Sequence, residues 1–87
     1  MVSQKVVVIN ESGVHARPAG LIVKTTAKYN SDVTFIVGEK TVVAKSILNI
    51  MVAGMKCGTE VEIRCDGENE EAELAELVAL FESGLGE

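Results

Sequence analysis

The chain has 87 residues, which predicts one domain with one modest core over residues 1–87. Its 13 acidic and 8 basic side chains give a net charge of -5, which argues against nucleic-acid binding because phosphate neutralisation needs a basic face. The apolar runs fall short of the ~20 residues of a membrane span, so we expect no membrane insertion. The N-terminus lacks the pattern of a signal peptide, which predicts a cytoplasmic protein.

The charge is unevenly distributed along the chain. Residues 1–45 carry six basic and three acidic side chains, a sum of +3, whereas residues 46–87 carry two basic and ten acidic ones, a sum of -8. We therefore assign the acidity to the scaffold and expect a locally basic patch in the first half. The basic half includes His15, Arg17, Lys24 and Lys45.

The two cysteines do not form a disulfide framework. Cys65 falls on the apolar phase of a strand pattern, where a small buried hydrophobe is expected. Cys57 lies in a turn-like stretch with no histidine close to it in the sequence. One histidine and two scattered cysteines do not make a zinc site, so we expect neither a metal nor a cofactor.

The chain opens with a predicted strand and a predicted helix. Residues 2–9 are rich in Val and Ile and run into turn residues, which indicates a strand. Apolar residues repeat at helical spacing within residues 16–29 and predict one apolar face. Pro18 fits only the first turn of a helix, which sets the start at His15 or Ala16.

A hairpin and a short helix follow. Alternating residues 33–37 and returning residues 41–44, joined by a tight turn, predict the hairpin. Ser46 stands where a helix N-cap is expected, before the short apolar segment 47–52. That segment has more aliphatic side chains than one helical face buries, so either most of them enter the core or some remain exposed as a docking patch.

The last third predicts a strand and a second amphipathic helix. Residues 60–65 alternate strictly between apolar and charged side chains. Asn69 is placed to cap the following helix, and Gly84 is placed to end it. The order is βαββαβα, which predicts an α+β sandwich with helices on one face of a mostly antiparallel sheet.

The segment 12–18 joins the first strand to the first helix and contains the lone histidine together with an arginine and a serine. A helix N-terminus offers unpaired N–H groups and a partial positive charge, and Arg17 adds a cation that can fork onto an anion. A phosphoryl group accepted by His15 would meet both. The alternatives are an ordinary surface histidine or a pocket that only binds an anion. The sequence has no Walker loop, no GxGxxG and no placeable Ser–His–Asp set.

The motif GVHARPA at residues 13–19 resembles the active-site motif of the HPr family, the histidine-containing phosphocarriers of the bacterial sugar phosphotransferase system. Residues 38–47 resemble the regulatory-serine region of that family, and residues 84–87 resemble the ending of its low-GC Gram-positive members. The likeness covers essentially the whole chain. It implies an open-faced βαββαβα sandwich with a four-stranded antiparallel sheet.

The resemblance also implies a function. His15 would be phosphorylated on Nδ1 by phospho-enzyme I, which draws on phosphoenolpyruvate, and the group would pass to IIA domains of sugar permeases. Arg17 would stabilise the phosphoryl group, and Ser12 would make a minor contribution from the loop. Such a protein is a carrier rather than an enzyme with its own turnover.

Ser46 matches the serine that HPr kinase/phosphorylase phosphorylates in relatives, which then act with the catabolite control protein. A phosphate there would place about two negative charges beside the docking surface and repel an acidic enzyme I. The docking surface implied by the resemblance comprises Ala16, Gly20, Leu21, Lys24, Ile47, Leu48 and Met51.

Three residues depart from the family pattern, and the departures bear on partner affinity rather than on the chemistry. Gly20 replaces a larger residue, which weakens its helix by up to ~1 kcal/mol and makes the contact surface shallower. Asn49 and Ile50 also differ from the commonest residues.

Two rival functions remain. One is a regulatory paralogue that acts mainly through Ser46 without carrier activity, and His15 argues against it because the known paralogue of that kind lacks the histidine. The other is a passive anion-binding or adaptor domain. A carrier that exchanges partners quickly would have small interfaces, and we expect a monomer.

Overall fold

The structure is a computed structural model that describes residues 1–86. Its elements follow the predicted order βαββαβα. They are β1 (Val2–Val7), α1 (Ala16–Thr26), β2 (Asp32–Val37), β3 (Lys40–Val43), α2 (Ile47–Val52), β4 (Glu60–Asp66) and α3 (Glu70–Glu82).

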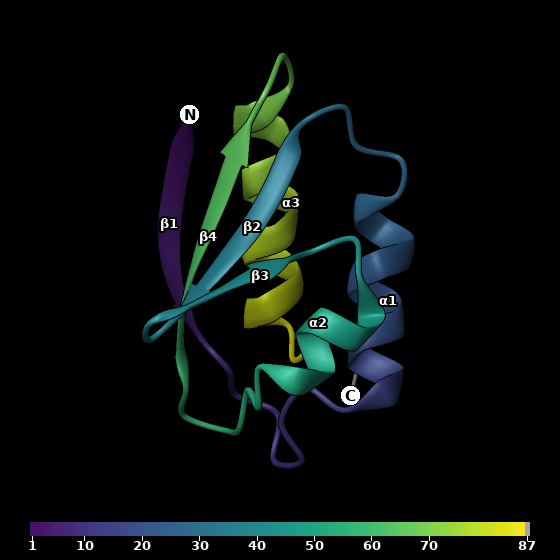
Figure 1. The fold of residues 1–87 in the computed structure, drawn as a ribbon, viewed down its shortest axis with the longest axis vertical. Coiled ribbons are helices and arrows are strands. Elements are labelled where there is room, and N and C mark those ends of the chain that lie inside the picture. The colour runs from purple at the N-terminus through teal and green to yellow at the C-terminus, as the bar shows by residue number, and fades with distance from the viewer. Residues whose placement is uncertain (87) are drawn as a thin grey trace.

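The four strands form one antiparallel sheet in the order β1-β4-β2-β3, so the last strand of the sequence lies inside the sheet. In β4, Val61 pairs with Val6 of β1 and Ile63 pairs with Phe35 of β2. The helices cover one face of the sheet and leave the other open, as Figure 1 shows. This confirms the predicted α+β open-faced sandwich.

The core lies between the sheet and the helices. Along β4, Val61, Ile63 and Cys65 are buried, as the alternation predicted. Phe35 of β2 meets Phe81 of α3 edge to face, with ring centroids 5.6 Å apart. Burial raises the pKa of the Cys65 thiol to about 11, so this cysteine remains protonated and unreactive at neutral pH.

Helix α1 ends at Thr26, three residues before the predicted end at residue 29. The backbone turns there, because Tyr29 N donates to the Thr26 carbonyl at 3.0 Å. Thr26 is fully buried and its hydroxyl donates to the Ala44 carbonyl at 3.3 Å, so it packs toward the β3–α2 connection. Ala27, expected on the apolar face, is exposed just beyond the helix.

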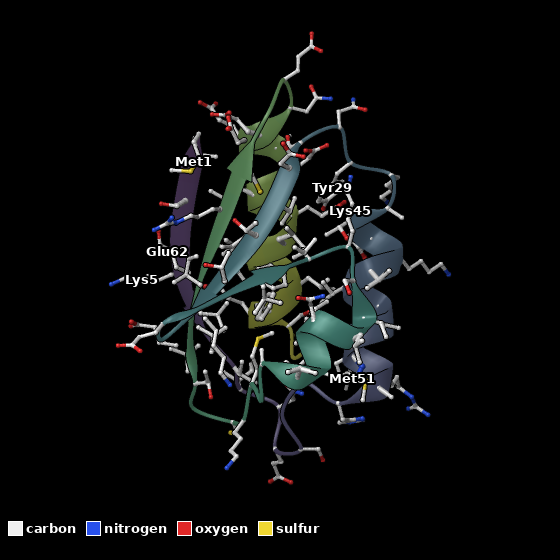
Figure 2. All side chains as sticks on the ribbon, viewed as in Figure 1. Met1, Lys5, Tyr29, Lys45, Met51 and Glu62 are labelled. Atoms are coloured by element: carbon white, nitrogen blue, oxygen red, sulfur yellow. The ribbon has the colours of Figure 1, made fainter. Side chains whose placement is uncertain are left out.

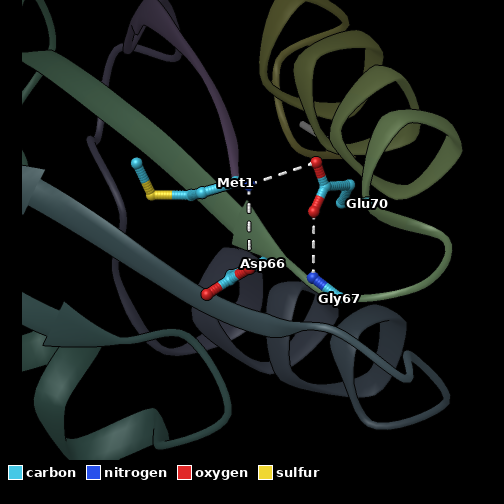
Figure 3. Close-up of polar contacts among 4 residues, drawn as sticks. All are labelled: Met1, Asp66, Gly67 and Glu70. Atoms are coloured by element: carbon cyan, nitrogen blue, oxygen red, sulfur yellow. Dashed lines mark hydrogen bonds and ion pairs between the residues drawn. The ribbon is translucent and has the colours of Figure 1, made fainter.

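The start of α3 differs from the predicted cap. Asn69 occupies the N-cap position, but its backbone (φ -106, ψ 27) is not extended and its side chain makes no capping bond. The carboxylate of Glu70 accepts from Gly67 N at 3.1 Å instead, and this bond lowers the pKa of Glu70. The Met1 amine lies 3.3 Å from Glu70 and 3.7 Å from Asp66, which ties the start of β1 to this turn (Figure 3).

A second acidic anchor joins α3 to the α1–β2 connection. The buried Glu73 carboxylate accepts from the backbone N–H groups of Asn30 at 3.1 Å and Ser31 at 3.3 Å. Burial raises its pKa, but the hydrogen bonds outweigh burial, and the net effect lowers the pKa of Glu73 below its usual value. The charged form of Glu73 therefore stabilises the fold.

The Gly20→Ala variant should be more stable than wild type by about 0.5–1 kcal/mol. A Cβ at Gly20 would meet only Ile47 Cδ1, at 3.9 Å, which is ordinary van der Waals contact. Gly13→Ala is the matched control and should destabilise strongly, because its Cβ would lie 2.6 Å from the Met55 carbonyl oxygen and its φ is +70. Urea unfolding measures both; a destabilised Gly20→Ala would contradict the packing described here.

Acidification should remove the contribution of Glu73. A carboxyl whose pKa is lowered by folding stabilises the protein above its ordinary pKa of 4.5 and loses that effect as the pH falls through the folded value. Glu73→Gln should therefore be less stable than wild type at neutral pH, and the difference should shrink in acid. Urea unfolding across this pH range tests it, with exposed Glu39→Gln as the control. A difference that is constant with pH would refute this role.

Candidate functional site

His15 and Arg17 lie at the N-terminus of α1, where the sequence placed them. His15 is the N-cap residue with extended backbone (φ -97, ψ -162), and its carbonyl accepts from Ala19 N at 2.9 Å. Pro18 lies in the first turn, as predicted. Both His15 and Arg17 are exposed. The first four helical residues are Ala, Arg, Pro and Ala, so the positive end of the helix dipole and one guanidinium lie together without an acid among them.

The loop before His15 is held by hydrogen bonds within the loop and to the segment before β4. Asn10 Nδ2 donates to the Gly13 carbonyl, and Gly13 N donates to the Asn10 carbonyl at 3.0 Å. Val14 N donates to the Met55 carbonyl at 2.8 Å. Gly13 adopts a positive φ and approaches the backbone of Met55 and Lys56 so closely that a Cβ would collide. These contacts fix the path of the chain into α1.

A cleft of about 640 Å³ opens beside the helix start. Its lining brings Ser12 and Arg17 together, does not include His15, and adds residues from the end of the chain. The lining comprises Ile9, Asn10, Glu11, Ser12, Arg17, Ser83, Gly84 and Gly86.

The sequence reasoning missed the C-terminal contribution to this cleft. Gly84, Leu85 and Gly86 all have positive φ, which turns the chain back toward α1. A Cβ at Gly86 would lie 3.1 Å from Leu21 Cδ2. The two glycines flanking Leu85 were the available signal, since consecutive left-handed residues need them.

Helix α2 resolves the alternative that the sequence left open. Ile50 alone of its six residues is buried, at 0% exposed. Ile47 and Met51 are 44% exposed and Leu48 and Val52 are 69% exposed, so the aliphatic segment forms a surface patch. Val52 was not among the predicted docking residues.

The predicted docking residues of α1 border this patch. Gly20 faces Ile47, and Figure 1 shows α1 and α2 side by side, with Met51 of α2 labelled in Figure 2. Ala16 and Lys24 are exposed, and Leu21 is half-buried. The structure therefore brings the seven predicted residues to adjoining parts of two helices.

Ser46 is the N-cap of α2, as predicted. Its half-buried side chain accepts from Asn49 N at 3.3 Å and from Asn49 Nδ2 at 2.9 Å. Asn49, a departure from the family pattern, thus adds a second bond to the cap. The neighbouring Lys45 does not join His15: its Nζ donates to the Tyr29 carbonyl at 3.3 Å, beyond the C-terminal end of α1 (Figure 2). The expected basic patch is therefore divided between the two ends of α1.

The remaining candidate groups are a pair of thiols. Cys57 is exposed, with Sγ 3.7 Å from the Ile9 carbonyl, and Cys65 is buried; neither forms a disulfide. Within residues 1–86, no three His, Cys, Asp or Glu side chains gather as a metal site. None of the helices described is long and apolar enough to cross a membrane.

Comparisons with known proteins agree with this arrangement. The family described as "PTS HPr component phosphorylation site" matches residues 2–83. The phosphocarrier protein HPr of Treponema pallidum is 38% identical over 87 residues, covering 100% of this chain and 99% of the relative.

Two solved structures extend the comparison. HPr-C-His from Thermoanaerobacter tengcongensis is 39% identical with a TM-score of 0.94, covering 100% of this chain and 98% of its own. The Bacillus subtilis catabolite repression containing protein Crh is also 39% identical, with a TM-score of 0.77, covering 97% of each chain.

Proposed function

The chain belongs to the HPr family of phosphocarriers of the phosphotransferase system, and on that basis we propose that His15 carries the phosphoryl group. The single observation that supports this assignment is the position of His15 as the N-cap of α1, two residues before Arg17. The protein would act in the cytoplasm as a carrier between phospho-enzyme I and IIA domains of sugar permeases.

The helix start suits transfer to and from Nδ1 of His15. In the forward step, the Nδ1 lone pair attacks phosphorus, the N–P bond to His15 forms and the bond from phosphorus to the donor atom breaks. The transferred oxygens carry their negative charge to the N-terminus of α1, where the backbone N–H groups of Ala16 and Arg17 have no helical carbonyl partner. Pro18 has no N–H, so the Arg17 guanidinium and Ser12 hydroxyl would supply further donors.

The exposed patch of α2 suits brief association with two successive partners. Ile47, Leu48 and Met51 supply an apolar centre, while Arg17 and Lys24 supply positive charge on α1. A small apolar contact with a charged rim gives fast association and limited affinity, as a carrier needs. The complementary partner surface would be an apolar depression with an acidic border.

Incubation with enzyme I and labelled phosphoenolpyruvate should place one label on His15, stable in base and labile in acid. His15→Ala should abolish it, and Arg17→Ala should slow it because one cation at the developing charge is lost. Absence of label on wild type, or label retained by His15→Ala, would reject the carrier assignment.

Met51→Glu should leave the maximal rate intact and raise the carrier concentration needed for half-maximal rate.

As a second function we propose regulation at Ser46 by HPr kinase/phosphorylase, with the catabolite control protein as a further partner. The favouring observation is that the Ser46 hydroxyl lies at the cap of the helix that exposes Ile47 and Leu48. The 39% identical Crh is described as a catabolite repression protein, which makes a regulatory role consistent with the family. A phosphate on Ser46 would add about two negative charges at the border of the docking patch.

Ser46→Asp should accept phosphoryl groups from enzyme I more slowly than wild type, through a weaker encounter that high salt partly relieves. Ser46→Asn is the matched control, because it has the same shape, caps helices equally well and carries no charge. Rapid-quench labelling of His15 in both variants gives the comparison. Equal rates for Asp and Asn would show that charge at this position does not govern transfer.

A further inference from the structure

Asn10 is a buried polar residue in the segment that leads to His15. It is 6% exposed, although it belongs to a loop that lines an open cleft. Its Nδ2 donates to the Gly13 carbonyl, whereas its buried Oδ1 has no hydrogen-bond partner among the described residues. An unmade buried bond is unfavourable, so an apolar residue would suit this position better unless the Nδ2 bond has a use.

That bond forms one half of a clamp on a single peptide group. The peptide between Gly13 and Val14 has its carbonyl held by Asn10 Nδ2 and its N–H held by the Met55 carbonyl at 2.8 Å. Since a peptide is planar, fixing both ends fixes its orientation. One bond comes from the loop after β1 and the other from the segment before β4.

The clamped peptide lies directly before the residue pair Val14–His15. Gly13 itself packs closely on the Met55–Lys56 backbone, since a Cβ at this position would lie 2.6 Å from the Met55 carbonyl oxygen. Loss of the Asn10 bond would free the carbonyl side of the peptide while leaving Val14 held. The peptide could then rotate, and the rotation would pass to the backbone of His15 and to the direction of its imidazole.

We propose that Asn10 is a positioning residue for phosphoryl transfer: through the Gly13 carbonyl it sets the orientation of His15 relative to the start of α1. The inference rests on the proposed role of His15 as the phosphoryl acceptor. Asn10 contacts no reacting atom in this scheme. Its loss acts on the maximal transfer rate and leaves the docking residues of α1 and α2 undisturbed, so the half-saturating concentration stays the same.

The test compares Asn10→Ala, Asn10→Asp and wild type in rapid-quench transfer from phospho-enzyme I. Misplacement of a reacting group by about 1 Å lowers rates on the order of 100-fold, so we expect a fall of at least about tenfold in the maximal rate. Asn10→Asp keeps the shape but, when ionised, lacks the N–H that Gly13 accepts. It should therefore be slow at neutral pH, and its rate relative to wild type at the same pH should recover in mild acid, where a protonated carboxyl can donate to the Gly13 carbonyl.

Thr26→Val is the matched control for a purely structural effect. Thr26 is likewise buried and donates to a backbone carbonyl, that of Ala44, but it lies at the other end of α1. It should lose stability and keep the wild-type maximal rate. Each variant is assayed at a temperature where circular dichroism shows it to be folded, and NMR shifts of the His15 ring should move in Asn10→Ala and not in Thr26→Val.

The outcomes separate this inference from the proposed function. If wild type takes no label, the role of His15 fails. If wild type is labelled and folded Asn10→Ala has the wild-type maximal rate, the positioning role of Asn10 alone is overturned. It is also overturned if the rates of Asn10→Ala and Thr26→Val fall together with their stabilities. If Asn10→Ala does not fold, the acid recovery of Asn10→Asp decides, and its absence rejects the proposal.

Discussion

The insertion of β4 between β1 and β2 is the constraint on which the site depends. β4 is the last strand in the sequence, yet it pairs with both neighbours, so the sheet is complete only when this distant segment enters it. Its pairing with β1 continues beyond the strand, since Val8 N donates to the Thr59 carbonyl at 2.9 Å and Gly58 N donates to the Val8 carbonyl at 2.7 Å. The pairing of these segments also brings the Met55 carbonyl close to Gly13. The path of the chain into His15 therefore depends on the pairing of two strands far apart in the sequence.

The distribution of charge follows from the same architecture. The acidic residues concentrated after residue 65 belong largely to the β4–α3 turn and α3, and two of them have structural tasks: Glu70 and Glu73 accept backbone N–H groups. A chain with a net charge of -5 can therefore expose a cationic helix start, because most of its acids lie on other elements, although Glu11 lines the cleft together with Arg17. Lys45 does not add to the positive charge at the helix start, because its Nζ donates to the Tyr29 carbonyl. Arg17 remains the cation nearest in sequence to His15.

The helices α1 and α3 and the strand β4 could be predicted because their apolar residues follow a clear period. The alternation of residues 60–65 reappears as alternating burial along β4, and Pro18 lies in the first turn of α1, because both features depend on local sequence alone. The family resemblance added the candidate roles of His15 and Ser46. The role of Asn10 could not be read in the same way, because its bond to Gly13 depends on backbone geometry that composition does not encode. The turn at residues 84–86 escapes prediction for a related reason: Gly84 indicates where the helix ends and residues 84–87 match a family ending, but neither signal gives the direction in which the chain turns.

Helix α2 shows how a short apolar helix can remain at the surface. Isolated helices shorter than about 12 residues are marginal in water, so six residues need support at both ends and in the core. Ile50 supplies the core contact, Ser46 caps the start and Lys40 Nζ lies 3.5 Å from the Ala53 carbonyl at the end. These three supports leave the remaining aliphatic side chains available to solvent. A change at Ser46 therefore acts on the cap of the helix and on the border of its exposed patch together, which is why the Asp and Asn variants are needed to separate charge from capping.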